Sequence, residues 1–140
     1  MHSNGHATQG TIEKKAREDR FQGHDYYMID ELLNDDHLLA RDAVRTWVKQ
    51  EVSPIIEEYA ERAECPQHLY KGLAEIGAFG PNIPAEYGGG GMDEIAYGLI
   101  MQELERGDSG IRSMASVQGS LVMYPIWKYA SEAQKRKYLP

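Results

Sequence analysis

The chain has 140 residues, of which 41% are apolar and 26% are charged, and its formal net charge is −7. This length suits one globular domain, and both percentages are ordinary for such a domain. The acidic balance argues against a nucleic-acid partner, because phosphate binding draws its affinity from lysine and arginine. A single cysteine, Cys65, rules out an intrachain disulfide and offers no cysteine–histidine framework for zinc.

Targeting signals are weak throughout the sequence. No run approaches the ~20 apolar residues that span a bilayer, so we expect no membrane insertion. The first residues lack the apolar core of a secretory signal, and Glu13, Glu18 and Asp19 are unlike a mitochondrial transit peptide. We therefore expect a bacterial cytoplasmic protein, with the mitochondrial matrix as the alternative.

Residues 1–20 are polar and are predicted to form a mobile tail, whereas residues 21–140 are predicted to form one helical domain. The apolar and aromatic segment 21–33 is expected to lie over the surface of the first helix. That helix is predicted to begin near Asn34, whose side chain can cap it. Pro54 is predicted to end or kink it near Val52 or Ser53.

A second helix is predicted after Cys65, with Pro66 at its first position and Gly77 as a left-handed cap. The segment PNIPAEYGGGG that follows is predicted to be a flexible or sharply turning loop. Its glycines match neither the dinucleotide-binding nor the Walker fingerprint. The sequence therefore gives no indication of a phosphate-binding loop.

A third helix is predicted from about Asp93 to Arg106. A fourth is predicted to begin with Ser109 or Gly110 as its cap, and Pro125 is predicted to interrupt it. The apolar face of the fourth helix is predicted to contain Val117, Leu121 and Val122.

The last helix is predicted to open with a capping box, in which Ser131 and Gln134 pair. No segment has the pattern of a β-strand, and no internal repeat is present. The sequence therefore predicts an all-α bundle of five or six helices joined by short loops.

Arg112 and Ser113 are the candidate substrate-binding residues. We place them in the first turn of the fourth helix, where free backbone N–H groups favour an anion. The guanidinium of Arg112 matches a carboxylate in shape, and the Ser113 hydroxyl is a further donor. The alternative is that Arg112 pairs with Asp108 as part of a helix cap.

Other polar side chains are not assigned a function. Paired carboxylates, of which Glu103 and Glu105 are one example, are interpreted as solvated helix faces. No residue is predicted to be catalytic, to ligate a metal or to bind a cofactor.

The run ELERGDSGIRSMASVQGSLVMYPIWKYASEAQKRKYLP, residues 103–140, closely resembles the glutaryl-CoA dehydrogenases of the acyl-CoA dehydrogenase family. AYGL and ELERGDSG are typical of the wider acyl-CoA dehydrogenase family. IRSMASVQGSLVMYPI is the part that resembles the glutaryl-CoA dehydrogenases in particular. GAFGPNIPAEYGGGGM also resembles a loop of that family. The resemblance runs from about Phe21 to the end of the sequence.

The resemblance implies a helical N-terminal domain of the acyl-CoA dehydrogenase fold, which a β-domain and a second helical domain follow in the family. Those later domains hold most of the FAD site and the glutamate base. The implied reaction is the oxidative decarboxylation of glutaryl-CoA to crotonyl-CoA and CO2, as in lysine and tryptophan degradation. Arg112 and Ser113 would contact the distal carboxylate of the substrate or lie beside it.

An electron-transfer flavoprotein is the implied partner of the full-length protein, and a homotetramer is its implied assembly. We expect the 140-residue chain alone to be inactive. Two alternatives remain open: a non-decarboxylating dehydrogenase of short-chain or dicarboxylyl thioesters, and a stand-alone helical interaction module. Whether the chain is a fragment or a natural truncation also remains open.

Overall fold

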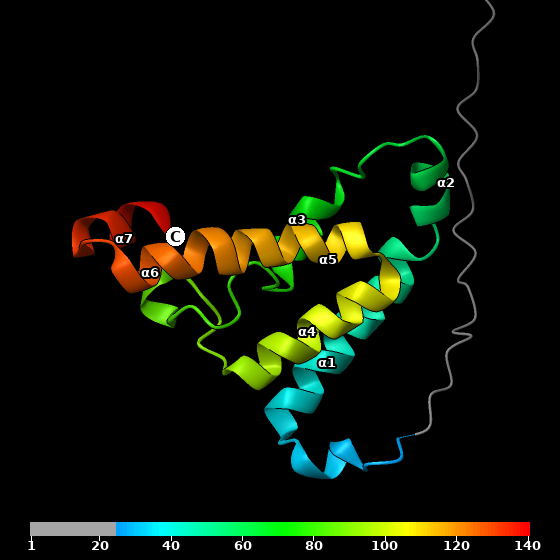
Figure 1. Ribbon diagram of the computed structural model, residues 1–140, viewed down its shortest axis with the longest axis horizontal. Coiled ribbons are helices and arrows are strands. Elements are labelled where there is room, and N and C mark those ends of the chain that lie inside the picture. The colour runs from blue at the N-terminus through cyan, green and yellow to red at the C-terminus, as the bar shows by residue number, and fades with distance from the viewer. Residues whose placement is uncertain (1–24) are drawn as a thin grey trace, which may run out of the picture.

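The computed structural model describes residues 25–140, and this range is helical without any β-strand (Figure 1). The predicted tail, residues 1–20, lies outside it. Seven α-helical segments occur in the described range, and two of them, α5 and α6, join end to end through a π-helix. If α5 and α6 are counted as one rod, the described residues form six helices. This confirms the predicted all-α fold.

α1 (Asp35–Trp47) begins where the sequence predicts, because Asn34 Oδ1 accepts a hydrogen bond from the backbone N–H of His37 at 2.9 Å. α1 continues into the π-helix η2 (Val48–Val52), and Pro54 lies in the turn before α2 (Ile56–Glu61). The predicted end of the helix near Val52 is confirmed. The helix ends there because Pro54 has no backbone N–H to donate to the preceding turn.

The segment before α1 forms a short 3-10 helix, η1 (Ile29–Leu32). An ion pair at 2.5 Å between Asp30 Oδ1 and Arg41 Nη1 ties this segment to α1. The side chains of Tyr26 and Tyr27 remain more than four-fifths exposed, at 84% and 85%. The described part of segment 21–33 is therefore attached to α1 by charge rather than by buried aromatic rings.

α3 (Leu69–Glu75) starts later than predicted, because the residues after Pro66 form a turn. Gly77 takes the predicted left-handed conformation, with φ of +71°. The loop beyond it contains a single 3-10 turn, η3 (Ala85–Tyr87), and two further glycines with positive φ. It is a sharply turning loop, as one of the two predictions stated.

α4 (Glu94–Gly107) is the central element, since it packs against both α1 and α5 (Figure 1). Asp93 caps it by accepting a hydrogen bond from the backbone N–H of Ala96 at 2.9 Å. Side chains from four helices meet in the main core, where the largest buried residues include Val44, Leu73, Ile100, Leu104 and Ile111.

α5 (Ser109–Ser116), the π-helix η4 (Val117–Met123) and α6 (Tyr124–Tyr129) form one unbroken rod, drawn from yellow to orange in Figure 1. The prediction that Pro125 interrupts this helix is wrong. In η4 the Tyr124 N–H bonds the carbonyl of Gly119, five residues back. Pro125 directly follows this π-helix in the first turn of α6, and the rod continues through it without a break.

The predicted cap of this rod also needs correction. Asp108, rather than Ser109 or Gly110, is the cap, and its Oδ1 accepts a hydrogen bond from the Ile111 N–H at 2.9 Å. Ser109 already lies in the first turn, and its hydroxyl donates to Glu105 instead.

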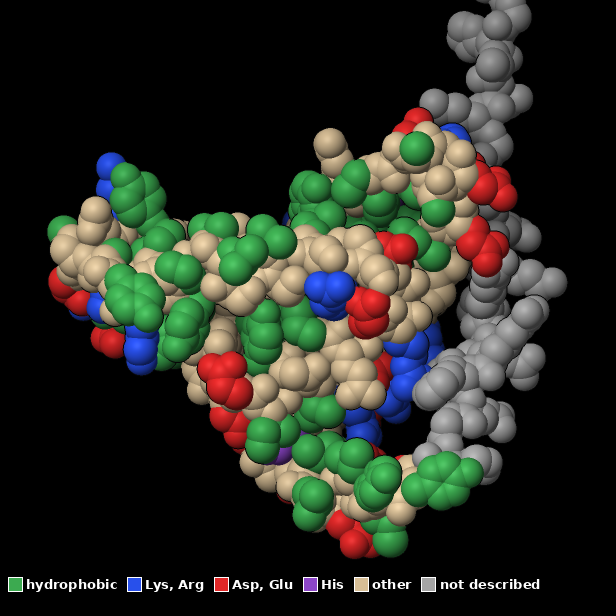
Figure 2. Space-filling view, viewed as in Figure 1, with side chains coloured by type: hydrophobic (Ala, Val, Ile, Leu, Met, Phe, Trp, Pro, Cys, Tyr) green, Lys and Arg blue, Asp and Glu red, His purple; other side chains and the backbone are tan. Residues whose placement is uncertain are grey.

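The predicted apolar face of the rod is exposed. Val117, Leu121 and Val122 are 49%, 68% and 40% exposed, and apolar side chains gather over the α5–α6 rod in Figure 2. Helical spacing identified the apolar stripe correctly, but no part of the described chain covers it. Among the helices of residues 25–140, none is long and apolar enough to cross a membrane.

α7 (Glu132–Tyr138) opens with the predicted capping box, in which the Ser131 N–H donates to Gln134 Oε1 at 3.0 Å. The chain then turns back so that Leu139 packs against Ile83 and Tyr87 in a second, smaller core. The hydroxyl of Tyr87 donates to Glu132 Oε2 at 2.9 Å. These contacts fasten α7 to the glycine-containing loop.

Candidate functional site

The backbone around Arg112 differs from the prediction. The Arg112 N–H already donates to the carbonyl of Asp108 at 3.1 Å, and the Ile111 N–H is satisfied by the Asp108 carboxylate. Arg112 and Ser113 therefore lie just beyond the free N–H groups of the helix start. An anion held by these two residues would depend on their side chains.

The guanidinium of Arg112 is held on the surface by two partners. Its Nε donates to Glu105 Oε2 at 2.6 Å, and its Nη1 donates to Ser116 Oγ at 3.3 Å. The Arg112 guanidinium, followed by the Ser109 hydroxyl, holds the pKa of the Glu105 carboxyl below its usual value. The alternative pairing of Arg112 with Asp108 is thus wrong, because the Asp108 carboxylate is turned to the cap.

Ser113 faces a shallow hollow beside α5, which we call the α5 hollow, with a volume of about 670 Å³. Its walls are mostly apolar or aromatic, and its lining consists of Tyr70, Phe79, Gly110, Ser113, Met114, Val117 and Gln118. Arg112 is not part of this lining. Since successive residues of a helix point about 100° apart, the two predicted side chains project from neighbouring faces of α5.

Sequence reasoning missed Tyr70, Phe79 and Gln118 as lining residues. Tyr70 belongs to α3 and Phe79 to the turn after it, so only the fold brings them to α5. Gln118 carried a usable signal, because it lies eight residues after Gly110 on one helical stripe.

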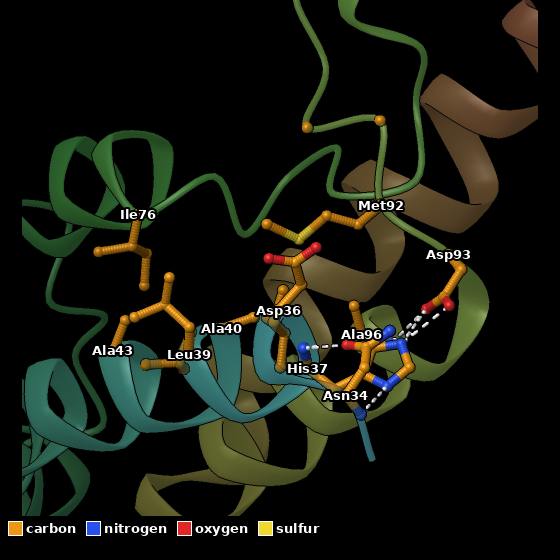
Figure 3. A pocket seen from close by; sticks show the side chains of 14 residues that line it. Asn34, Asp36, His37, Leu39, Ala40, Ala43, Ile76, Met92, Asp93 and Ala96 are labelled. Atoms are coloured by element: carbon orange, nitrogen blue, oxygen red, sulfur yellow. Dashed lines mark hydrogen bonds and ion pairs between the residues drawn. The ribbon is translucent and has the colours of Figure 1, made fainter.

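A second cavity, of about 570 Å³, lies between the start of α1 and the loop before α4 (Figure 3). His37 forms part of its wall and is only 6% exposed. Its Nδ1 accepts a hydrogen bond from the Asn34 N–H at 3.3 Å, and its Nε2 donates to Asp93 Oδ2 at 2.8 Å. Because both ring nitrogens are engaged, His37 ties two helix starts together rather than serving as a free base.

Asp93 belongs to the same arrangement. The Ala96 N–H, followed by His37, lowers the pKa of the Asp93 carboxyl below its ordinary value. Figure 3 shows the His37 ring pointing at this carboxylate across the start of α4. The rest of the wall is mostly apolar, with Leu39 and Ile76 among its residues, and it also contains Asp36. The arrangement stabilises the junction of α1 and α4.

Glu103 is buried, so its interpretation as a solvated carboxylate is wrong. Its side chain is 1% exposed and accepts two hydrogen bonds from Arg45, Nε to Oε2 at 3.0 Å and Nη2 to Oε1 at 2.8 Å. Arg106 Nε lies 3.3 Å from the same Oε2. The hydrogen bonding of Arg45 to the Glu103 carboxylate raises the pKa of Arg45. The ion pair of Glu103 with Arg45 therefore holds α1 against α4.

The glycine run forms no cradle for a nucleotide. A Cβ at Gly89 would lie 2.1 Å from the carbonyl oxygen of Ile83, so the backbone is already closely packed there. The N–H groups of Gly90 and Gly91 donate to the carbonyls of Gly80 and Ile83, at 3.0 Å and 2.8 Å. These donors are not available to a phosphate, and the loop does not fit the pyrophosphate of FAD.

Comparison with known proteins covers most of the described chain. Residues 34–140 match the family model described as "Acyl-CoA dehydrogenase, N-terminal domain". A 3-(aryl)acrylate reductase from Clostridium sporogenes is 37% identical over 105 residues, which is 75% of this chain and 28% of that protein.

Two solved structures of glutaryl-CoA dehydrogenase from Mycobacterium smegmatis are also similar. One is 43% identical with a TM-score of 0.74, over 80% of this chain and 29% of the other. The second, described in complex with FADH2, is 40% identical with a TM-score of 0.77, over 81% and 29%. The chain thus spans well under a third of the length of these relatives.

Proposed function

Because the chain belongs to the acyl-CoA dehydrogenase family through its N-terminal domain, we propose that it is the N-terminal helical part of an FAD-dependent acyl-CoA dehydrogenase whose substrate is glutaryl-CoA. The resemblance of residues 103–140 to glutaryl-CoA dehydrogenases supports this substrate. So does the 43% identity to the Mycobacterium smegmatis protein.

The observation that carries the proposal is the α5 hollow with a cation beside it. Phe79, Met114 and Val117 give the hollow an apolar wall suited to the methylene groups of an acyl chain. Arg112 lies on the next face of α5 and is 35% exposed, and its guanidinium would exchange its contacts with Glu105 and Ser116 for a bound carboxylate. A carboxylate removed from water requires such a partner, because an unpaired buried charge is strongly unfavourable.

The chemistry itself depends on groups outside residues 25–140. FAD, when bound by the full-length protein, would accept the two electrons removed from the substrate. In the implied reaction, glutaryl-CoA is oxidised and then loses its distal carboxylate as CO2 to give crotonyl-CoA. The described residues contribute the binding surface for the acyl chain. An electron-transfer flavoprotein as acceptor and a homotetrameric assembly belong to the same proposal.

Substitution of Arg112→Ala in the full-length protein tests the carboxylate role. We expect kcat/KM for glutaryl-CoA to fall by the equivalent of about 2–5 kcal/mol, while kcat/KM for butyryl-CoA changes little. Arg62→Ala is the matched control, because Arg62 is half-exposed on the surface beyond α2 and pairs with Glu58. An equal loss on both substrates would show that Arg112 does not recognise the distal carboxylate.

A second candidate is a related enzyme that retains the carboxylate, or one that acts on another acyl thioester. The Clostridium sporogenes relative favours this alternative, since a protein 37% identical to the chain carries the name of a reductase of aryl acrylates. Product analysis after a single turnover with glutaryl-CoA separates the two. Crotonyl-CoA and CO2 support decarboxylation, whereas glutaconyl-CoA without CO2 supports the alternative.

A further inference from the structure

The lining of the α5 hollow follows one helical stripe. Gly110, Ser113, Met114, Val117 and Gln118 occupy positions i, i+3, i+4, i+7 and i+8. Gly110 has no side chain, which leaves the start of the stripe open. Ser113 and Gln118 are therefore the two side chains on this stripe that can form strong hydrogen bonds.

Gln118 is the more versatile of the two. Its side chain carries two N–H donors and one carbonyl acceptor, and it is exposed toward the hollow. Within residues 25–140 it takes part in no hydrogen bond to another side chain or to the backbone. Its donors are thus free for a bound molecule, whereas the guanidinium of Arg112 is already shared between Glu105 and Ser116.

The distance between the two polar groups suits an extended acyl chain. Five residues of helix advance about 7.5 Å, so Ser113 and Gln118 are separated by roughly that length along the rod. Between them the wall is apolar, formed by Met114 from α5, Val117 from η4 and Phe79 from the turn after α3. A chain of methylene groups fits that stretch, and a polar end group would meet one of the two polar side chains.

We propose that Gln118 is a specificity-determining residue, whose amide donates a hydrogen bond to the polar end of the acyl group bound in the α5 hollow. This inference rests on the proposed function, since it assumes an acyl-CoA substrate. Gln118 selects for acyl chains that end in an oxygen-bearing group over chains of similar length that end in a methyl group. It complements Arg112, which supplies charge from the neighbouring face of α5.

The test compares Gln118→Leu and Gln118→Glu in the full-length protein, with glutaryl-CoA and butyryl-CoA as substrates. Leucine keeps the bulk but removes the donors, so kcat/KM for glutaryl-CoA should fall roughly 10- to 100-fold relative to butyryl-CoA. Glutamate keeps the shape but faces the substrate carboxylate with a like charge, and should produce a larger relative loss. Gln102→Leu, an exposed glutamine of α4 outside the hollow, is the matched control.

The outcomes separate the two proposals. If the unmodified protein oxidises glutaryl-CoA but Gln118→Leu leaves the ratio of the two substrates within about twofold of its original value, the role of Gln118 is wrong while the proposed function stands. If the unmodified protein neither binds nor oxidises either thioester, both proposals are wrong. Calorimetric titration with glutaryl-CoA gives the binding readout, and a selective loss of affinity in Gln118→Leu supports the inference.

Discussion

The helices of the α1–α4 contact and of the α5–α6 rod each carry an apolar stripe, but the two stripes lie in different environments. Along α4, Ile100 and Leu104 are 2% and 0% exposed, and the adjacent carboxylate of Glu103 is fully paired. Along the rod, Leu121 is 68% exposed and Arg112 shares its guanidinium with surface groups. The first region is a completed core, whereas the second presents apolar and polar side chains outward, as a binding face does.

Truncating one leucine in each region should give the largest difference between them. Leu104→Ala leaves a cavity in a fully packed core and should lower the free energy of unfolding by about 2–5 kcal/mol. Leu121→Ala removes a side chain that already faces water and should change it by less than about 0.5 kcal/mol. Urea denaturation of the 140-residue chain, followed by circular dichroism, measures both. Similar losses would mean that the rod is as well packed as α4.

Removing the buried charge of Glu103 should have the next largest effect on the free energy of unfolding. Glu103→Gln removes the buried carboxylate that pairs with Arg45 and Arg106, and we expect a loss of about 2–3 kcal/mol in unfolding free energy. The loss stays below that of a fully buried pair because the Arg45 side chain is 31% exposed and can reach water. Glu105→Gln is the surface control, and it should cost less in the same denaturation experiment. A larger loss for Glu105→Gln would reverse the comparison.

The Asp108 cap of the rod should contribute less to the free energy of unfolding than the Glu103 ion pair does. Asp108→Ala removes the acceptor for the Ile111 N–H and should cost about 1 kcal/mol, whereas Asp108→Ser retains a capping oxygen and should cost a fraction of that. Amide hydrogen exchange should show faster exchange at Ile111 in the alanine variant, with α4 unaffected. Unchanged exchange at Ile111 would indicate that another group caps the rod.

Acid should weaken both regions gradually. The pKa values of Asp93 and Glu105 are lower in the folded chain than usual, so the folded state favours their charged forms. The stability they contribute is present above the ordinary carboxyl pKa of about 4 and is lost as the pH falls through their folded values. Asp93→Asn should flatten this pH dependence in denaturation curves recorded between about pH 2 and 6. An unchanged slope would rule out Asp93 as a contributor.

Local signals in the sequence predicted what depends on neighbours along the chain. Asn34, Gly77 and the Ser131–Gln134 box each set a helix end through residues within four positions of themselves, and each was found where predicted. The all-α fold followed in the same way, because helical spacing and caps are local features.

The errors at the candidate site concern mainly residues whose environment is set by distant parts of the chain, whereas the errors at Asp108 and Pro125 are local. Glu103 resembles any charged helix residue until Arg45, 58 positions earlier, is brought beside it. Competition among nearby acceptors decides the partner of Arg112, and spacing alone does not distinguish Asp108 from Glu105. The α5 hollow needs Tyr70 and Phe79 from another helix and turn. Ser113 was predicted as a site residue, but the lining around it was not.

The π-helix η4 makes the register of the rod sensitive to single-residue insertions and deletions. Each residue of a helix turns the chain about the helix axis, so shortening η4 by one residue would rotate everything from Pro125 onward about that axis. Trp127 and Ile126 would then swing away from Ile83, and Leu139 would leave the small core it closes. Substitutions along the outer surface of η4 would keep this register, whereas a change in its length by one residue would detach α7 from the glycine loop.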